Sequence, residues 1–191
     1  MPAPNPAALD FLLTRRSSPA KILGLPAPSR EELVPILTAG LRVPDHGMLQ
    51  PWRLVVLEAE GLKRLAKVAG ERAAVLGLDA EKTEKGIGQF RRSVLCVAVI
   101  ECPRSVAKVP ALEQTYSAGA VCLSLVNAAL ASGWGASWIT GWPAHDAGFG
   151  PVALDLVDGE RVAGFIHMGT PTSEVSDRPR PDLSTTVTWA G

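Results

Sequence analysis

The sequence predicts a single domain, residues 1–191, in which helices and strands are combined. Three observations favour this fold class. The chain has 191 residues, of which 47% are hydrophobic, so it is long enough to bury a core of its own. Residues 29–41 have the end signals and the apolar periodicity of a surface helix. Residues 52–57 and 94–100 are short apolar runs of the kind that form strands.

Two helices are expected before the first strand. Residues 6–14 predict a short helix with leucines on one side, and the Pro/Ala-rich residues 1–8 are expected to be flexible. For residues 29–41, Ser29 is the expected N-cap and Glu32 completes a capping box. The helix is predicted to end before a polar linker that leads to the first strand.

The middle of the chain predicts two strands separated by two helices. Residues 52–57 are rich in aromatic and β-branched side chains and are expected to form a buried strand. Residues 60–69 and 79–92 carry many charges and predict helices with exposed faces, which could cover a pocket. Residues 94–100 contain no polar side chain except a cysteine, which predicts a strand buried on both faces.

Residues 112–132 predict a long helix that is apolar nearly all round. Such a helix is expected to be buried on all sides, either in a deep core or at a subunit interface. Three polar side chains within it would then need partners, namely Gln114, Ser117 and Asn127. Glycines after this helix predict its end and the start of another strand. Residues 161–168 predict the last strand, followed by an extended tail at residues 171–191.

Composition excludes several classes of function. The net charge is zero and no block of Lys or Arg stands out, so nucleic acid is not an expected partner. Cys96, Cys102 and Cys122 lack metal-ligand spacing, so no metal site is expected. Cys96 and Cys122 lie in apolar segments and are expected to be small core residues, which fits a reducing cytoplasm. The N-terminus lacks a signal-peptide pattern, and the longest apolar stretch is too short for a bilayer, so no membrane role is expected.

Two motifs carry the functional prediction. The first is Arg15-Arg16-Ser17, directly after the expected first helix. Its forked guanidinium donors suit a phosphate, although the same residues would also complement a helix dipole. The second lies between a helix and a strand, where ligand contacts are common, and has the sequence Arg42-x-Pro44-Asp45-His46-x-x-x-Gln50-Pro51-Trp52. Taken alone, its charged residues could be an ordinary solvated helix end and turn.

In this order, the two motifs resemble the FMN-dependent nitroreductase family, and most closely its small, YdjA-like branch. The resemblance implies an α+β fold, with a mainly antiparallel central sheet flanked by helices, in an intertwined homodimer. It implies FMN at the subunit interface, with the residues of the first motif from one subunit and Arg42 and His46 from the other. The cofactor-binding residues implied are Arg15, Arg16, Ser17, Arg42, His46, Gln50, Trp138, Ile139, Thr140, Arg178 and Arg180. Where larger members of the family carry a further basic residue this chain has Pro19, and Lys21 could supply the charge instead.

The resemblance also implies an activity. No nucleophile–base arrangement is found in the sequence, so no catalytic side chain is assigned, as is usual where a flavin carries the chemistry. The implied enzyme is an NAD(P)H oxidoreductase that passes hydride through FMN, by ping-pong turnover, to nitroaromatics, quinones or similar flat acceptors. Two alternatives stay open: a specialised flavin reaction such as a dehydrogenation, and a flavin-binding protein without catalytic activity.

Overall fold

The centre of the fold is the strand β5 (Arg161–Pro171), in a computed structural model that describes residues 3–191. Phe165 of β5 pairs with both Ala98 and Ile139, so β3 (Cys96–Glu101) lies on one side of β5 and β4 (Gly135–Ile139) on the other. The edge strand β2 (Trp52–Leu57) pairs with β3, and the short β1 (Leu23–Gly24) pairs with the end of β5. All of these pairings are antiparallel.

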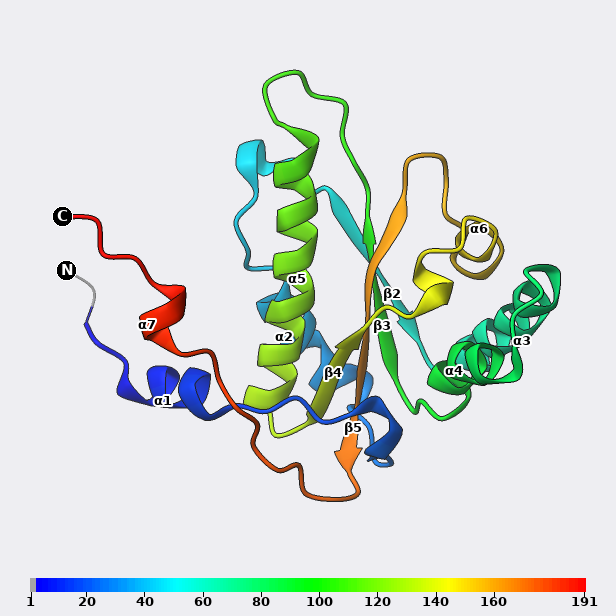
Figure 1. The fold of residues 1–191 in the computed structure, drawn as a ribbon, viewed down its shortest axis with the longest axis horizontal. Helices are drawn as coiled ribbons and strands as arrows, with labels where there is room; N and C mark the ends of the chain where they lie inside the picture. Colours follow the sequence, from blue (N-terminus) through cyan, green and yellow to red (C-terminus); the bar gives the residue numbers. More distant parts are fainter. Residues whose placement is uncertain (1–2) are drawn as a thin grey trace.

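Helices cover both faces of this sheet (Figure 1). One face carries α2 (Arg30–Gly40) and α5 (Ala111–Ala131), while the other carries α3 (Ala59–Val75), α4 (Ala80–Arg91) and α6 (Phe149–Leu154). Alternate residues of β3 belong to the two cores: Val97 and Val99 pack on the α2/α5 side, and Ala98 and Ile100 on the other. The predicted burial of this strand on both faces is therefore confirmed.

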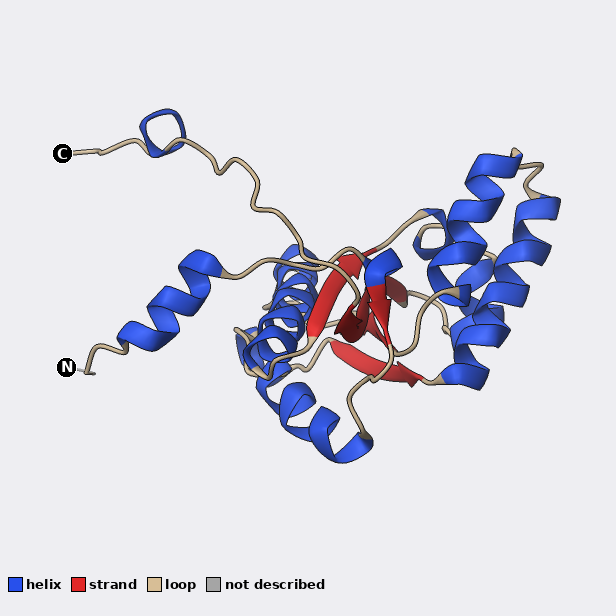
Figure 2. Ribbon diagram, turned by 90° about the horizontal axis from the view of Figure 1, so that it is seen from below, coloured by secondary structure: helices blue, strands red, loops and turns tan. Residues whose placement is uncertain are grey.

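Two segments extend away from the body on the same side (Figures 1 and 2). They are α1 (Pro6–Thr14) and the tail after β5, which contains the short helix α7 (Leu183–Thr186). Neither helix has a buried residue. Three 3-10 turns complete the elements of the described residues: η1 (Ala20–Ile22), η2 (His46–Met48) and η3 (Trp142–Ala144).

Most predicted elements are present. The capping box of α2 forms as expected, because Ser29 Oγ accepts from the Glu32 backbone while the Glu32 carboxylate accepts from the Ser29 backbone. Observed bounds differ from prediction by a few residues at α3, which continues to Val75, and at β5, which continues to Pro171. Residues 1–2 of the N-terminal segment predicted to be flexible lie outside the described residues, and Pro6 already begins α1.

One burial prediction, for β2, is wrong, and the burial of α5 on all sides is not reached within the single chain, which leaves its predicted alternative of a subunit interface untested. In the strand β2 only Leu57 is buried, Val56 is exposed and the other residues are half-buried, because the strand lies at the edge of the sheet. The long helix α5 is not buried on all sides, since Leu112, Tyr116 and Leu123 are exposed. Two of its three polar residues find partners as predicted: Gln114 bonds the Arg104 backbone, and Ser117 Oγ donates to the Pro44 carbonyl oxygen. The prediction is wrong for Asn127, whose buried Oδ1 has no partner among residues 3–191.

Within residues 3–191, no helix has the length and apolar character needed to cross a membrane. In the same residues, no group of three His, Cys, Asp or Glu side chains is placed to hold a metal ion. The three cysteines are free and buried.

Candidate functional site

The predicted phosphate-binding residues gather around one cavity, which we call the arginine cavity. It has a volume of about 420 Å³ and lies between the segment after α1, the C-terminal half of α5, the strand β4 and the tail. Its lining includes Arg15, Arg16, Ser17, Trp138, Arg178 and Arg180, all of them predicted from the sequence, together with Pro19, Leu123, Val126 and Ser137. Residues more than 160 positions apart in the chain therefore share one site.

A backbone contact fixes the first motif against the sheet. The Ser18 N–H donates to the Ala136 carbonyl oxygen of β4 over 3.0 Å, and Ser18 itself is buried. Arg15 Nη2 donates to Ser17 Oγ at 2.8 Å. Arg16 reaches across to the tail, where it donates to the Ser176 carbonyl oxygen at 3.2–3.3 Å. These contacts hold the two arginines at the cavity while leaving donors free for a ligand.

Positive charge is concentrated at this cavity. Partial burial, followed by the nearby charges of Arg180 and Arg16, lowers the pKa of Arg15. The carboxylate of Asp177 offsets part of this charge, because it lies 2.9 Å from Arg180 Nη2 and 3.7 Å from Arg16 Nε. The Arg15 Nε–H is buried and has no partner among residues 3–191. A buried guanidinium donor without an acceptor is costly, so the site favours an anion with several oxygens.

A second cavity of about 420 Å³ continues from the first, and we call it the α4 cavity. The two share Pro19 and Ser137 in their linings. The α4 cavity is lined by Lys21 and Ile139, as expected from the sequence, and by four residues of α4 and its C-cap: Lys85, Gly88, Gln89 and Arg92. Gln89 Oε1 is buried without a partner among the described residues.

The sequence suggested that the helix at residues 79–92 could cover a pocket, but it did not predict which of its residues line the site. Its charges indicated an exposed face, and charge patterning alone does not separate a solvated helix from the wall of a site. One signal was available: Gly86 and Gly88 lie in the helix interior, where glycine costs about 1 kcal/mol relative to alanine and so indicates a packing requirement. Both are buried, against Trp142 and Arg92 respectively.

The second motif lies elsewhere in the single chain. Arg42, His46 and Gln50 are exposed, beside the N-terminal half of α5, whereas the arginine cavity lies beside its C-terminal half. His46 Nδ1 lies 2.6 Å from the Glu113 carboxylate in the first turn of α5. One chain therefore does not bring the two motifs together. Thr140, the remaining predicted residue, is half-buried and directly follows β4.

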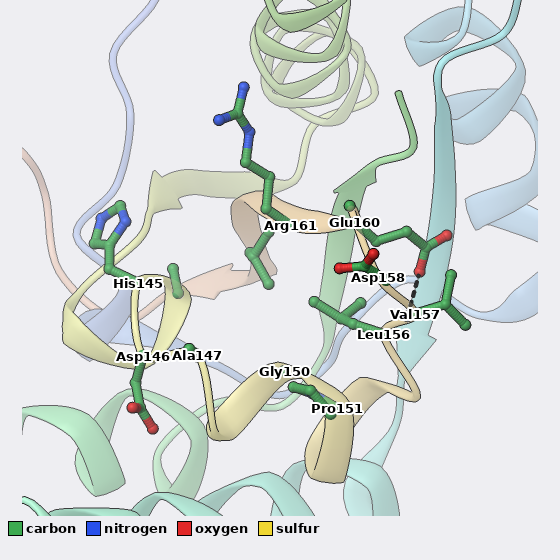
Figure 3. Close-up of a pocket in the computed structure, with 13 residues that line it drawn as sticks. His145, Asp146, Ala147, Gly150, Pro151, Leu156, Val157, Asp158, Glu160 and Arg161 are labelled. Carbon is green, nitrogen blue, oxygen red and sulfur yellow. Dashed lines mark hydrogen bonds between the residues drawn. The ribbon is translucent and has the colours of Figure 1, made fainter. Parts of the chain in front are cut away.

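A third cavity, shown in Figure 3, contains none of the predicted residues. It has a volume of about 370 Å³ and lies between η3, α6 and the start of β5. Two of its three carboxylates are paired within the chain, since Asp146 binds Arg72 and Glu160 binds Arg53. Glu160 also accepts from the Val157 N–H, the dashed contact in Figure 3. These groups therefore serve the structure of the loop.

Comparison with known proteins identifies the family. A model described as the nitroreductase family matches residues 12–170, which is most of the chain. The chain belongs to the nitroreductase family. The Escherichia coli (strain K12) protein named "Putative NAD(P)H nitroreductase YdjA" is 35% identical over 187 residues, covering 95% of this chain and 98% of that protein. The chain is thus an enzyme of an oxidoreductase family, and the predicted resemblance is confirmed.

Solved structures show the same nitroreductase fold. A nitroreductase-like family protein from Bacillus cereus superposes with a TM-score of 0.80 at 18% identity, covering 100% of this chain and 98% of that one. An FMN and NADPH-dependent nitroreductase, NfnB, from sphigopyxis sp. strain HMH has a TM-score of 0.73 at 18% identity, covering 96% and 99%. The predicted α+β fold with a mainly antiparallel sheet is therefore confirmed.

Proposed function

We propose that this nitroreductase-family protein is an FMN-dependent NAD(P)H oxidoreductase of the cytoplasm that reduces flat electrophiles such as nitroaromatics or quinones. The observation that carries the proposal is the arginine cavity and its continuation into the α4 cavity. The names of the relatives support the same reading: NAD(P)H for the E. coli protein, and FMN with NADPH for NfnB.

The donors of the arginine cavity fit the phosphate of FMN. Guanidinium groups match phosphate oxygens with paired N–H donors, and Ser17 adds a hydroxyl. The unpartnered Arg15 Nε–H and the lowered pKa of Arg15 are both conditions that a bound dianion would relieve. Arg178 and Arg180 would complete the phosphate site from the tail.

The α4 cavity fits the ring of the same cofactor. Ile139 supplies an apolar surface, Gln89 an amide that lacks a partner for Oε1, and Lys21 a cation without an ion pair among the described residues. Lys85 and Arg92 add cations that are paired in the single chain with Glu81 and Glu84. Bound FMN would supply the hydride transfer, accepting from NAD(P)H and donating to the second substrate. The cations would favour negative charge at the polar edge of the ring, with Lys21 in the role that Pro19 cannot fill.

The exposed face of α5 supports a homodimer. Leu112, Tyr116, Gly119 and Leu123 follow the i, i+4, i+7, i+11 spacing of one helix face, and the three large side chains are exposed. Around Gly119 an added Cβ would meet only Trp138, at 4.0 Å, so a second helix could approach closely there. An antiparallel two-fold crossing at Gly119 would put the N-terminal half of one α5 over the C-terminal half of the other. That would bring the partner's second motif over the arginine cavity.

The direct test is the absorption spectrum of the purified protein. We expect a yellow protein whose cofactor is released on denaturation and has the spectrum of FMN. Anaerobic NADH or NADPH should bleach it, and a nitro acceptor should restore the colour. A colourless protein that ignores added FMN contradicts the proposal. If the protein binds FMN but NAD(P)H does not reduce it, the proposed binding site stands and the proposed oxidoreductase activity is contradicted.

Arg15→Ala tests the phosphate site. We expect it to weaken FMN binding about tenfold to a hundredfold, because hydrogen bonds to charged groups contribute about 1.5–3 kcal/mol. Fluorescence titration of the apoprotein with FMN measures the dissociation constant. Arg64→Ala, at an exposed arginine of α3, is the matched control and should leave it unchanged. Equal affinities of the two variants would remove Arg15 from the site.

A further inference from the structure

His46 and Glu113 form a close pair between two segments that are distant in sequence. His46 Nδ1 lies 2.6 Å from Glu113 Oε2, a distance typical of a strong hydrogen bond between imidazole and carboxylate. The loop that carries His46 is fixed at both ends to the same residue of α5. Ser117 Oγ donates to the Pro44 carbonyl oxygen at 2.7 Å, and Trp52 Nε1 donates to Ser117 Oγ at 3.1 Å.

The turn between these anchors is also held from within. Both oxygens of the Asp45 carboxylate accept backbone N–H groups, from Leu49 at 3.1 Å and from Gln50 at 2.9 Å. Three residues there have positive φ: Gly47 at 73°, Met48 at 53° and Gln50 at 46°. Non-glycine residues seldom adopt this conformation, so the hydrogen bonds to Asp45 hold a strained turn in place. With the backbone fixed, the remaining freedom of His46 is the orientation of its ring.

We propose that Glu113 is a positioning residue for His46. This proposal rests on the function proposed above. A carboxylate can only accept, so the short contact places a proton on His46 Nδ1. The Nε2 atom, on the far side of the ring, is then directed away from Glu113 with its lone pair available. In the proposed two-fold arrangement the second motif would lie over the arginine cavity of the other subunit, where Nε2 would accept from an N–H or hydroxyl of the cofactor.

Stability alone does not explain the pair. The side chains are 58% and 46% exposed in the single chain, and exposed ion pairs contribute little to folding. By contrast, a carboxylate that selects the tautomer and orientation of a histidine determines whether the other ring nitrogen donates or accepts a hydrogen bond, and in which direction. The geometry therefore fits a binding role better than a structural one.

The tautomer can be measured directly. The chain has only three histidines, so ¹⁵N-histidine labelling gives a simple NMR spectrum, and His46→Ala assigns the signals of His46. For the neutral imidazole of the wild-type protein, we expect the Nδ1–H tautomer at His46. Glu113→Ala should shift it toward the Nε2–H tautomer, and Glu113→Gln, whose carbonyl still accepts, should retain Nδ1–H. An unchanged tautomer in Glu113→Ala overturns the proposal.

FMN affinity tests the consequence in a double-mutant cycle. We expect Glu113→Ala and His46→Ala each to weaken FMN binding by about fivefold to tenfold. The double variant should be no weaker than His46→Ala alone, because Glu113 acts through His46. Glu113→Gln should stay within about threefold of the wild type. Glu60→Ala removes an exposed carboxylate of α3 and is the matched control.

The outcomes separate this proposal from the function on which it rests. Additive losses in the double variant would show that Glu113 acts independently of His46 and would overturn the proposal. If His46→Ala has no effect while Arg15→Ala does, the cofactor site stands and the positioning role falls. A wild-type protein that binds no FMN contradicts the proposed function, and the affinity part of this proposal fails with it.

Discussion

At the scale of single residues, Glu160 is the carboxylate most strongly perturbed by a partner. Arg53 donates to both of its oxygens, at 3.0 and 2.7 Å, and Cys102 Sγ lies 3.0 Å from Oε1. The hydrogen bonds from Arg53, with a smaller contribution from the Cys102 thiol, lower the pKa of Glu160 from 4.5 to about 2. Because the folded-state pKa is depressed, this stabilisation is present above pH 4.5 and is lost as the pH falls toward 2.

Glu160→Gln should therefore destabilise the protein at pH 7 much more than at pH 2.5. We expect the difference between wild-type and variant unfolding free energies to shrink by on the order of 2 kcal/mol between these values. Urea unfolding followed by circular dichroism measures both. Glu71→Gln, at an exposed carboxylate 3.8 Å from Lys67, is the control and should show little pH-dependent difference. If the destabilisation by Glu160→Gln changes with pH no more than that by Glu71→Gln, the stabilising role of Arg53 is contradicted.

The residues of the candidate site differ in how far the sequence could predict them. Forked donors after a helix indicated a phosphate only weakly, and the resemblance to a family selected that interpretation for Arg15, Arg16 and Ser17. That Arg178 and Arg180 would join them depends on where the tail leaves β5, which no local pattern contains. The Glu113–His46 contact likewise joins segments 67 positions apart and was not predicted.

At the scale of elements, local chemistry predicted more than packing did. The capping box placed the start of α2 correctly, because its hydrogen bonds lie within four residues. The burial of β2 was wrong because burial depends on which strands are neighbours, and an apolar run does not show whether it will lie at an edge. For the same reason, the residues of α4 that line the site were not predicted, although this segment was expected to be able to cover a pocket.

The docking of α4 gives an element-scale prediction. Trp142 Nε1 donates to the Lys82 carbonyl oxygen at 2.9 Å, and an added Cβ at Gly86 would overlap the Trp142 indole. Gly86→Ala should therefore displace α4 and destabilise the protein by about 1–3 kcal/mol, despite the better helix propensity of alanine. It should also weaken FMN binding, because Lys85 and Gln89 move with the helix.

Gly70→Ala is the matched control within α3. An added Cβ there would lie 3.5 Å from Ile87, an ordinary contact, so the substitution should stabilise the protein by up to about 1 kcal/mol through helix propensity. Denaturant unfolding of both variants gives the comparison. Equal effects of the two substitutions would mean that the contact with Trp142 does not hold α4 in place.

At the scale of the whole molecule, the single chain leaves apolar surface that a second copy would cover. Helix α1 extends from the body with Leu9, Leu12 and Leu13 exposed at 59%, 56% and 71% (Figure 2). Burying one leucine side chain contributes about 1.5–3 kcal/mol. In a two-fold interface each of the three leucines would be buried once in each subunit, so its contribution would be doubled. An intertwined dimer accounts for both the exposed helix and the separation of the two motifs within one chain.

The double substitution of Leu9→Ser with Leu13→Ser tests this dimer. We expect the wild type to sediment as a dimer and the variant to dissociate toward monomer at micromolar concentration. The FMN affinity of the variant should fall as the dimer dissociates, since Arg42 and His46 would come from the partner. Leu76→Ser, at an apolar side chain that is 45% exposed beyond α3, should change neither property. A variant that remains dimeric would place α1 outside the interface, whereas a monomeric wild type that binds FMN tightly would contradict the shared site itself.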